Sequence, residues 1–107
     1  MSEGDQGGVV VTENPSAPRY EARLDGALAG FAAYLPAVGM IVLTHTEVEP
    51  QYEGQGIGSA LARAALDDVR AKGLKVMPLC PFIHAWMARH PDYTDLAFNA
   101  PPSRVTD

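Results

Sequence analysis

Short runs of β-branched residues, or of apolar residues alternating with charges, fill the first half of the chain, and turn residues separate them. Alternation of this kind is typical of strands that bury one face. Asp25-Gly26 is a strong hairpin signal. Gly30 marks a candidate bulge, and Pro36 is expected to end its strand because proline cannot donate to a ladder. The expected strands are residues 9–12, 20–24, 28–35 and 40–48. They predict an antiparallel meander.

The second half changes to helical periodicity directly after residue 58. Apolar residues recur there at three- and four-residue spacing, with polar residues on the opposite face. The expected buried stripe is Leu61, Ala62, Ala65, Leu66 and Val69. Gly73 is expected to close this helix at its C′ position. A strand–helix–strand unit of this kind runs parallel and right-handed.

A short strand at residues 74–79 and a second helix from Pro81 to about His90 complete the prediction, with Pro91 as the stop. The core residues expected on this helix are Phe82, Ile83, Trp86 and Met87. The expected fold class is α/β (α+β): a mixed sheet whose N-terminal antiparallel meander is followed by a strand–helix–strand unit and a C-terminal helix.

Composition narrows the class of protein. The 107 residues suit one domain, expected at 9–97, with a disordered segment at 1–8 and a loose tail at 98–107. The formal net charge of −5 argues against a general nucleic-acid surface. No apolar run is long enough to cross a membrane, and the acidic N-terminus is unlike a signal peptide. Cys80 is the only cysteine, so no intrachain disulfide can form. A cytoplasmic monomer or homodimer is expected.

The glycines between the last strand of the meander and the first helix predict an anion site. Gly54, Gly56 and Gly58 alternate immediately before the helical stripe. Bare amides at a helix N-terminus suit a phosphate or pyrophosphate. A P-loop is disfavoured, because no Lys follows the glycines. A dinucleotide fingerprint is disfavoured too, because Ser59 stands at its third glycine and no acid follows the helix.

The run Glu53-Gly54-Gln55-Gly56-Ile57-Gly58 resembles the coenzyme A loop of the GNAT superfamily of N-acetyltransferases, usually Arg/Gln-x-x-Gly-x-Gly/Ala, with Glu53 in the place of Arg or Gln. Together with His45-Thr46, with 78–82 and with 89–93, it is similar to short, single-domain YjdJ-type GNAT proteins. The resemblance implies a GNAT-like sheet and acetyl-CoA as the cofactor. It places the pantetheine arm along the strand that ends at Val48. The implied cofactor-binding residues are Val48, Gly54, Gln55, Gly56, Ile57, Gly58 and Ser59.

Three side chains are candidates for the chemistry of acetyl transfer. His45 and Glu47 share one face of a strand, and either can take a proton from an ammonium group. Cys80 precedes a helix, where it can carry the acyl group, protonate the leaving thiolate or line the pocket. A zinc site at Cys80 and His84 is disfavoured by their spacing, and no metal is expected.

The expected function is acetyl-CoA-dependent N-acetyl transfer to a small-molecule or protein amine. Two alternatives stay open at this point. One is a non-catalytic module that binds CoA or acyl-CoA as a sensor or regulator. The other is a small interaction domain. The bases in the second half, Arg63, Arg70, Lys72, Lys75 and Arg89, suggest an anionic ligand there, although ordinary surface scatter explains them equally well.

Overall fold

A computed structural model describes residues 8–98 of the chain. Nine elements follow one another: β1 (Val9–Asn14), β2 (Arg19–Leu24), β3 (Ala27–Ala37), β4 (Met40–Val48), η1 (Pro50–Tyr52), α1 (Ile57–Ala71), β5 (Lys75–Pro78), α2 (Pro81–Ala88) and η2 (Pro91–Leu96). The expected disordered segment at 1–8 and loose tail at 98–107 fall outside the described residues, apart from Gly8 and Phe98.

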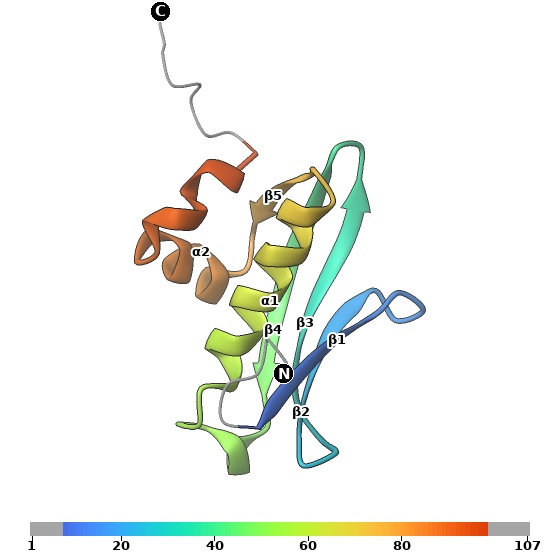
Figure 1. Cartoon of the computed structure of the whole chain (residues 1–107), viewed down its shortest axis with the longest axis vertical. Coiled ribbons are helices and arrows are strands. Elements are labelled where there is room, and N and C mark those ends of the chain that lie inside the picture. Colours follow the sequence, from blue (N-terminus) through green and yellow to red (C-terminus); the bar gives the residue numbers. More distant parts are fainter. Residues whose placement is uncertain (1–7, 99–107) are drawn as a thin grey trace, which may run out of the picture.

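The five strands form one sheet in the order β1-β2-β3-β4-β5. The first three pairings are antiparallel, and β5 pairs parallel to β4. Helix α1 contacts every strand of the sheet, while α2 packs against α1 and against β4 and β5 (Figure 1). The expected fold class, a meander followed by a strand–helix–strand unit and a helix, is confirmed.

The inner face of the sheet is the one that packs against α1. A Cβ added to Gly30 would lie 3.1 Å from Ile57 and 2.5 Å from the main-chain oxygen of Glu47. Gly30 therefore allows the first turn of α1 to approach β3 closely. Because side chains alternate along a strand, Ala32 and Tyr34 share this inner face, and Phe31 points to the outer face. The register also shifts beside Gly30, between Ala22 and Arg23, so the expected bulge lies there.

The expectation that Pro36 ends its strand is wrong. Strand β3 continues through Pro36, which lies opposite Ile41 of β4, to Ala37. The pairing of β3 with β2 has already stopped at the Arg19–Ala33 pair. At Pro36 the strand is therefore paired on one side only, and a proline is tolerated where its missing N–H faces no neighbour.

Helix α1 carries the centre of the core, as its periodicity predicts. All five residues of the expected stripe are buried, as are Ile57 and Ala60. Gly73 follows the helix with φ of 71°, the left-handed conformation of a C′ glycine. Away from the glycine loop, α1 is tied to the meander by Asp68, which accepts a hydrogen bond from buried Tyr20 (2.8 Å) and an ion pair from Lys72 (2.8 Å). Burial and this hydrogen bond raise the pKa of the Tyr20 phenol.

Helix α2 buries Ile83, Trp86 and Met87, as expected, but ends at Ala88 and not near His90. The expectation that Phe82 faces the core is wrong. Its side chain is 39% exposed and lies over Gly58, where an added Cβ would meet the ring at 2.8 Å. Phe82 and Ile83 are neighbours, so the helix turns them about 100° apart and one of them faces away from the core.

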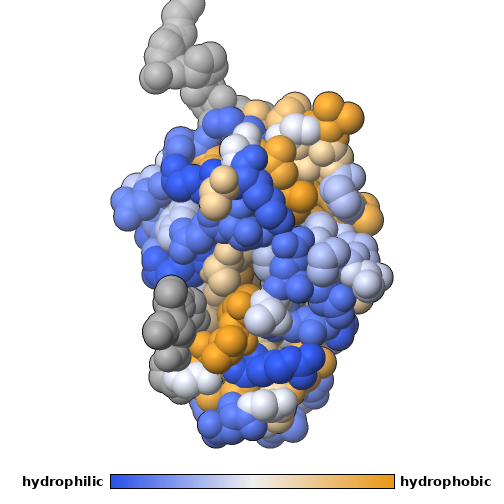
Figure 2. All heavy atoms as spheres, turned by 45° about the vertical axis from the view of Figure 1, so that its right-hand side comes forward, coloured by the Kyte–Doolittle hydropathy of each residue, from blue (hydrophilic) through white to orange (hydrophobic). Residues whose placement is uncertain are grey.

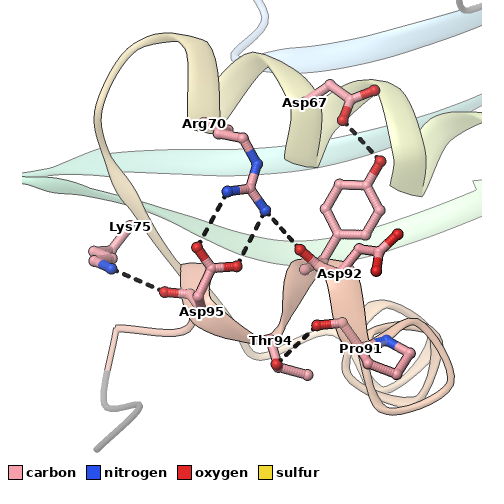
Figure 3. Close-up of polar contacts among 8 residues, drawn as sticks. Asp67, Arg70, Lys75, Pro91, Asp92, Thr94 and Asp95 are labelled. Carbon is pink, nitrogen blue, oxygen red and sulfur yellow. Dashed lines mark hydrogen bonds and ion pairs between the residues drawn. The ribbon is translucent and has the colours of Figure 1, made fainter. Parts of the chain in front are cut away.

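The segment η2 is held against α1 and β5 by polar contacts (Figure 3). Arg70 donates to both carboxylate oxygens of Asp95, at 3.1 Å each, and to the main-chain oxygen of Asp92 at 2.7 Å. Lys75 donates to the main-chain oxygen of Asp95, and the Tyr93 hydroxyl donates to Asp67. The hydrogen bonds from Arg70 lower the pKa of the Asp95 carboxyl.

Exposed apolar residues gather at the end of the molecule that holds the β3–β4 turn. Figure 2 shows hydrophobic residues at the upper right of its view, above a broad polar band. Leu35 and Val38 of this hairpin are 58% and 97% exposed. The glycine loop lies at the opposite end of α1 in Figure 1. This apolar end therefore does not belong to the anion site.

Candidate functional site

A gap opens between β4 and β5 because their pairing is short. The ladder runs from Met40–Lys75 to Leu43–Pro78, yet β4 continues to Val48. Pro78 has no N–H to donate, and β5 ends there. The chain then turns into α2, with the Cys80 amide donating to the Leu43 carbonyl (3.0 Å). Residues 44–48 of β4 therefore have no β5 partner, and a strand-like ligand can bind along them.

The glycine loop adjoins the far end of this gap. Gly54 and Gly56 have φ of 85° and 81°, which residues with a Cβ rarely adopt. Gly56 is the N-cap of α1, and no side chain caps it. The first main-chain bond of the helix is from Ala60 to Gly56. The amides of residues 57–59 come before this bond, and within residues 8–98 none of them donates to a main-chain carbonyl outside the helix. This arrangement is a nest of donors at the positive end of a helix dipole.

A pocket of about 430 Å³ joins the loop to α2. Its lining contains six of the seven residues expected to bind the cofactor: Val48, Gly54, Gly56, Ile57, Gly58 and Ser59. Gln55 is not part of the lining. Tyr52 and Glu53 line one wall, so the acid that replaces the usual Arg or Gln belongs to the pocket.

Another part of the pocket lining comes from α2 and the residues that follow it, and of these the sequence suggested a ligand role for Arg89 alone. It consists of Phe82, Trp86, Arg89 and His90. Trp86 is buried, and its indole N–H donates to Ser59 Oγ at 2.9 Å, which fixes α2 beside the first turn of α1. Phe82 and Trp86, four residues apart, share one face of α2, and Arg89 and His90 follow directly after the helix ends at Ala88.

His45 and Glu47 lie on the outer face of the sheet. They pair with Ala33 and Phe31, which point away from α1. Their side chains are 57% and 60% exposed, and His45 Nε2 lies 3.0 Å from Glu47 Oε2. The prediction that they share a face is confirmed. They form a solvent-facing pair at the edge of the gap.

Cys80 lies on the other side of β4. It is the N-cap residue of α2, is 3% exposed, and donates its Sγ–H to Thr46 Oγ at 3.3 Å. Thr46 pairs with Ala32 and so faces inward. The three chemical candidates are therefore not gathered at one point, because the backbone of β4 separates Cys80 from the His45–Glu47 pair.

Within the described part of the chain, no cluster of His, Cys, Asp or Glu is arranged to hold a metal ion. No helix among residues 8–98 is both long and apolar enough to span a bilayer.

The fold and the loop define a class of protein, and comparison with known families agrees. The family model for GCN5-related N-acetyl-transferases matches residues 19–96. The match covers more than half of the chain and includes the gap, the loop and α2. The chain therefore belongs to the GCN5-related N-acetyltransferase family, a family of acyltransferases.

Among individual relatives, protein NATD1 of Mus musculus is 34% identical over 90 residues, which is 81% of this chain and 82% of the mouse protein. NATD1 of Homo sapiens is 40% identical over 52 residues, which is 49% of this chain and 46% of the human protein. The YjdJ-type subgroup stays a prediction.

Two solved structures show the same fold. A GCN5-like protein from Staphylococcus aureus superposes with a TM-score of 0.66 at 17% identity, covering 95% of this chain and 100% of its own. The ribosomal-protein-S18-alanine N-acetyltransferase from Escherichia coli gives a TM-score of 0.52 at 20% identity, covering 68% of this chain. The matched part is 43% of the Escherichia coli chain, so the likeness concerns the fold and not the substrate.

Proposed function

We propose that this chain transfers an acetyl group from acetyl-CoA to an amine. The observation that carries the proposal is the continuity of three features: the unpaired stretch of β4 at 44–48, the uncapped amides at the start of α1, and the pocket of about 430 Å³ beside them. They suit in turn a pantetheine amide chain, a pyrophosphate and a nucleotide.

The residues present fit such a ligand. The amides of Ile57, Gly58 and Ser59 would hold the pyrophosphate, and the free edge of β4 would hold the pantetheine arm as an added strand. When bound, acetyl-CoA supplies an activated acyl carbon. A main-chain amide near Val48 would stabilise the negative charge that develops on the carbonyl oxygen.

The reaction needs a proton acceptor before a new bond can form. An ammonium acceptor loses its proton to the exposed His45–Glu47 pair, directly or through water. The amine nitrogen then attacks the carbonyl carbon, the C–N bond forms as the C–S bond breaks, and the nitrogen's second proton is transferred to the departing sulfur. We assign Cys80, whose thiol bonds to Thr46 on the inner side of β4, either as the relay for this transfer or as a wall of the pocket. As a relay it would give its thiol proton to the departing sulfur and take the nitrogen's second proton in return.

A covalent route through Cys80 is the alternative within the same function. The Cys80 sulfur would attack the carbonyl carbon, CoA would leave with the thiol proton, and the amine would then take the acetyl group from Cys80. Mass spectrometry after incubation with acetyl-CoA separates the two routes. A mass increase of one acetyl group on the wild-type protein, absent in Cys80→Ala, identifies the covalent route, and no increase in either protein identifies the direct one.

Calorimetric titration with acetyl-CoA tests the function itself. Saturable binding together with acetylation of an amine in a broad panel is expected. No heat and no thermal shift at millimolar acetyl-CoA would overturn the proposal.

A second candidate function is a CoA-binding module without catalysis. It is favoured by the separation of His45 and Glu47 from Cys80, and by the low exposure of Cys80. Tight binding of acetyl-CoA without turnover on any amine of the panel would support this second candidate against the first.

A further inference from the structure

The basic side chains of the described residues differ in whether the protein already satisfies them. Five bond to the protein's own oxygens: Arg19, Arg23, Arg70, Lys72 and Lys75. Arg63 stacks on the Trp86 ring at 5.3 Å. Among Lys and Arg of residues 8–98, Arg89 alone has neither a hydrogen bond nor an ion pair nor a ring contact for its side chain, and it lines the pocket. Its charge is available to a ligand.

His90 is held beside Arg89 in a fixed orientation. Its ring stacks on Trp86 with centroids 3.7 Å apart and planes 12° apart. Its Nδ1 lies 2.7 Å from the Trp86 carbonyl, which can only accept, so Nδ1 carries the proton and donates it. Nε2 is then the ring atom left for a ligand. Trp86 in turn is bonded to Ser59, so this imidazole is positioned relative to the glycine loop.

The positions of Arg89 and His90 match a second anionic group. They follow Trp86 by three and four residues, directly after the end of α2, and line the same pocket as the glycine loop. Coenzyme A carries, beyond its pyrophosphate, a phosphate on the 3′ oxygen of the ribose, one sugar ring away. Glu53, the acid of the pocket, follows η1 and belongs to the loop, whereas Arg89 and His90 follow α2. The charges of the pocket therefore favour the second phosphate at the α2 wall.

We propose that Arg89 and His90 bind the ribose 3′-phosphate of coenzyme A, so that the protein discriminates CoA from dephospho-CoA. This inference rests on the proposed function, because it needs the pyrophosphate on the loop. The Arg89 guanidinium has no competing protein partner, and the His90 ring, once protonated at Nε2 as well as at Nδ1, can donate from Nε2. Both then give charge-assisted hydrogen bonds to a phosphate. The five basic residues already paired with protein oxygens lack this property.

Calorimetric titration of the full chain with CoA and with dephospho-CoA tests the inference. We expect the wild type to bind CoA at least about tenfold more tightly than dephospho-CoA. Arg89→Gln should remove most of this preference by weakening CoA binding, and should leave the affinity for dephospho-CoA unchanged. His90→Phe, which keeps an aromatic ring against Trp86 but loses Nε2, should reduce the preference as well.

Lys75→Gln is the matched control, because it removes the same unit of charge from a residue that bonds to η2 and does not line the pocket. It should keep the wild-type preference. Equal wild-type affinity for the two ligands would overturn the inference and leave the proposed function intact. Binding of neither ligand would overturn the proposed function. Equal weakening of both ligands by Arg89→Gln would show that Arg89 acts on the pyrophosphate or on the fold, which also contradicts the inference.

Discussion

Replacing Gly56 by alanine separates the backbone strain of the glycine loop from its role as a binding surface. Gly56 has φ of 81° and lines the pocket at the N-cap of α1. Gly39, in the turn between β3 and β4, has φ of 73°, and a Cβ added there meets nothing within 4 Å. The two glycines carry similar strain in different places, so Gly39→Ala is a matched control for Gly56→Ala.

The left-handed backbone conformation sets the expected loss of unfolding free energy in both variants. An alanine forced into it costs about 1–2 kcal/mol, and the lower entropy of the unfolded chain returns part of this cost. We expect each variant to lose about 1 kcal/mol of unfolding free energy. For a domain of this size, that lowers Tm by about 4–8 °C. In the Gly56→Ala variant, the added Cβ is also expected to enter the space in front of the amides at 57–59.

Thermal unfolding with and without CoA measures both effects in one assay. Both variants should unfold at a similar reduced Tm without ligand. Gly39→Ala should keep the ligand-induced rise in Tm, and Gly56→Ala should lose it, with an affinity at least about tenfold weaker. Wild-type CoA affinity in Gly56→Ala, or its loss in Gly39→Ala, would refute the argument that the bare backbone at position 56 is the binding surface.

Three further changes test the scaffold. Hydrogen bonds to Glu21, of which the one from Asn14 has the largest effect, lower the pKa of its carboxyl from 4.5 to about 2. The ionised carboxylate therefore stabilises the fold above about pH 4.5, and this stabilisation is lost as the pH falls towards 2. In urea unfolding, Glu21→Gln should lower the unfolding free energy by about 1–2 kcal/mol at pH 7 and by almost nothing at pH 2. The loss at pH 7 is modest because solvent screens the partly exposed Arg19 and Arg23. A loss of stability that does not change with pH would contradict this. Trp86→Phe removes the donor to Ser59 and should lower stability by about 1–2 kcal/mol and weaken CoA binding, as calorimetry can show; unchanged binding would argue against that contact as the brace of the pocket. Tyr20→Phe removes the hydrogen bond to Asp68 and should lower the unfolding free energy by about 1 kcal/mol in urea unfolding. A variant more stable than the wild type would show that this hydrogen bond does not stabilise the contact between α1 and the meander.

Local patterns predict most of the fold because each strand and helix carries its own period. The Asp25-Gly26 turn, the stripe on α1 and the C′ glycine at 73 all depend on neighbours within one turn or one hairpin. The prediction for Pro36 is wrong for the opposite reason. Whether a proline breaks a strand depends on which side of it is paired, and that is decided by where β2 stops. A prediction based only on residues adjacent in sequence contains no information about which strands pair with β3 at Pro36.

The residues of the candidate site also fall into those that local sequence patterns predict and those that they do not. The loop glycines and Val48 are predictable because main-chain geometry and motif order determine them, and the pocket contains them. The α2 wall is not, since Phe82 and Trp86 are apolar residues at helical spacing and the simplest interpretation of such a pattern is core. Trp86 is in fact both: its ring is buried at 1% exposure while its edge bonds to the residue that follows the loop.

The geometry around β4 also constrains any mechanism that this chain can use. The strand presents His45 and Glu47 to solvent on one side and Thr46, with Cys80 hydrogen-bonded to it, on the other. In the proposed reaction, the proton taken from the acceptor and the proton given to the leaving sulfur would therefore be transferred on opposite faces of β4, with the reacting carbon in the gap between them. Such an arrangement does not require His45 and Cys80 to touch. It requires that β5 leave β4 after Leu43, which Pro78 ensures by having no N–H to continue the ladder.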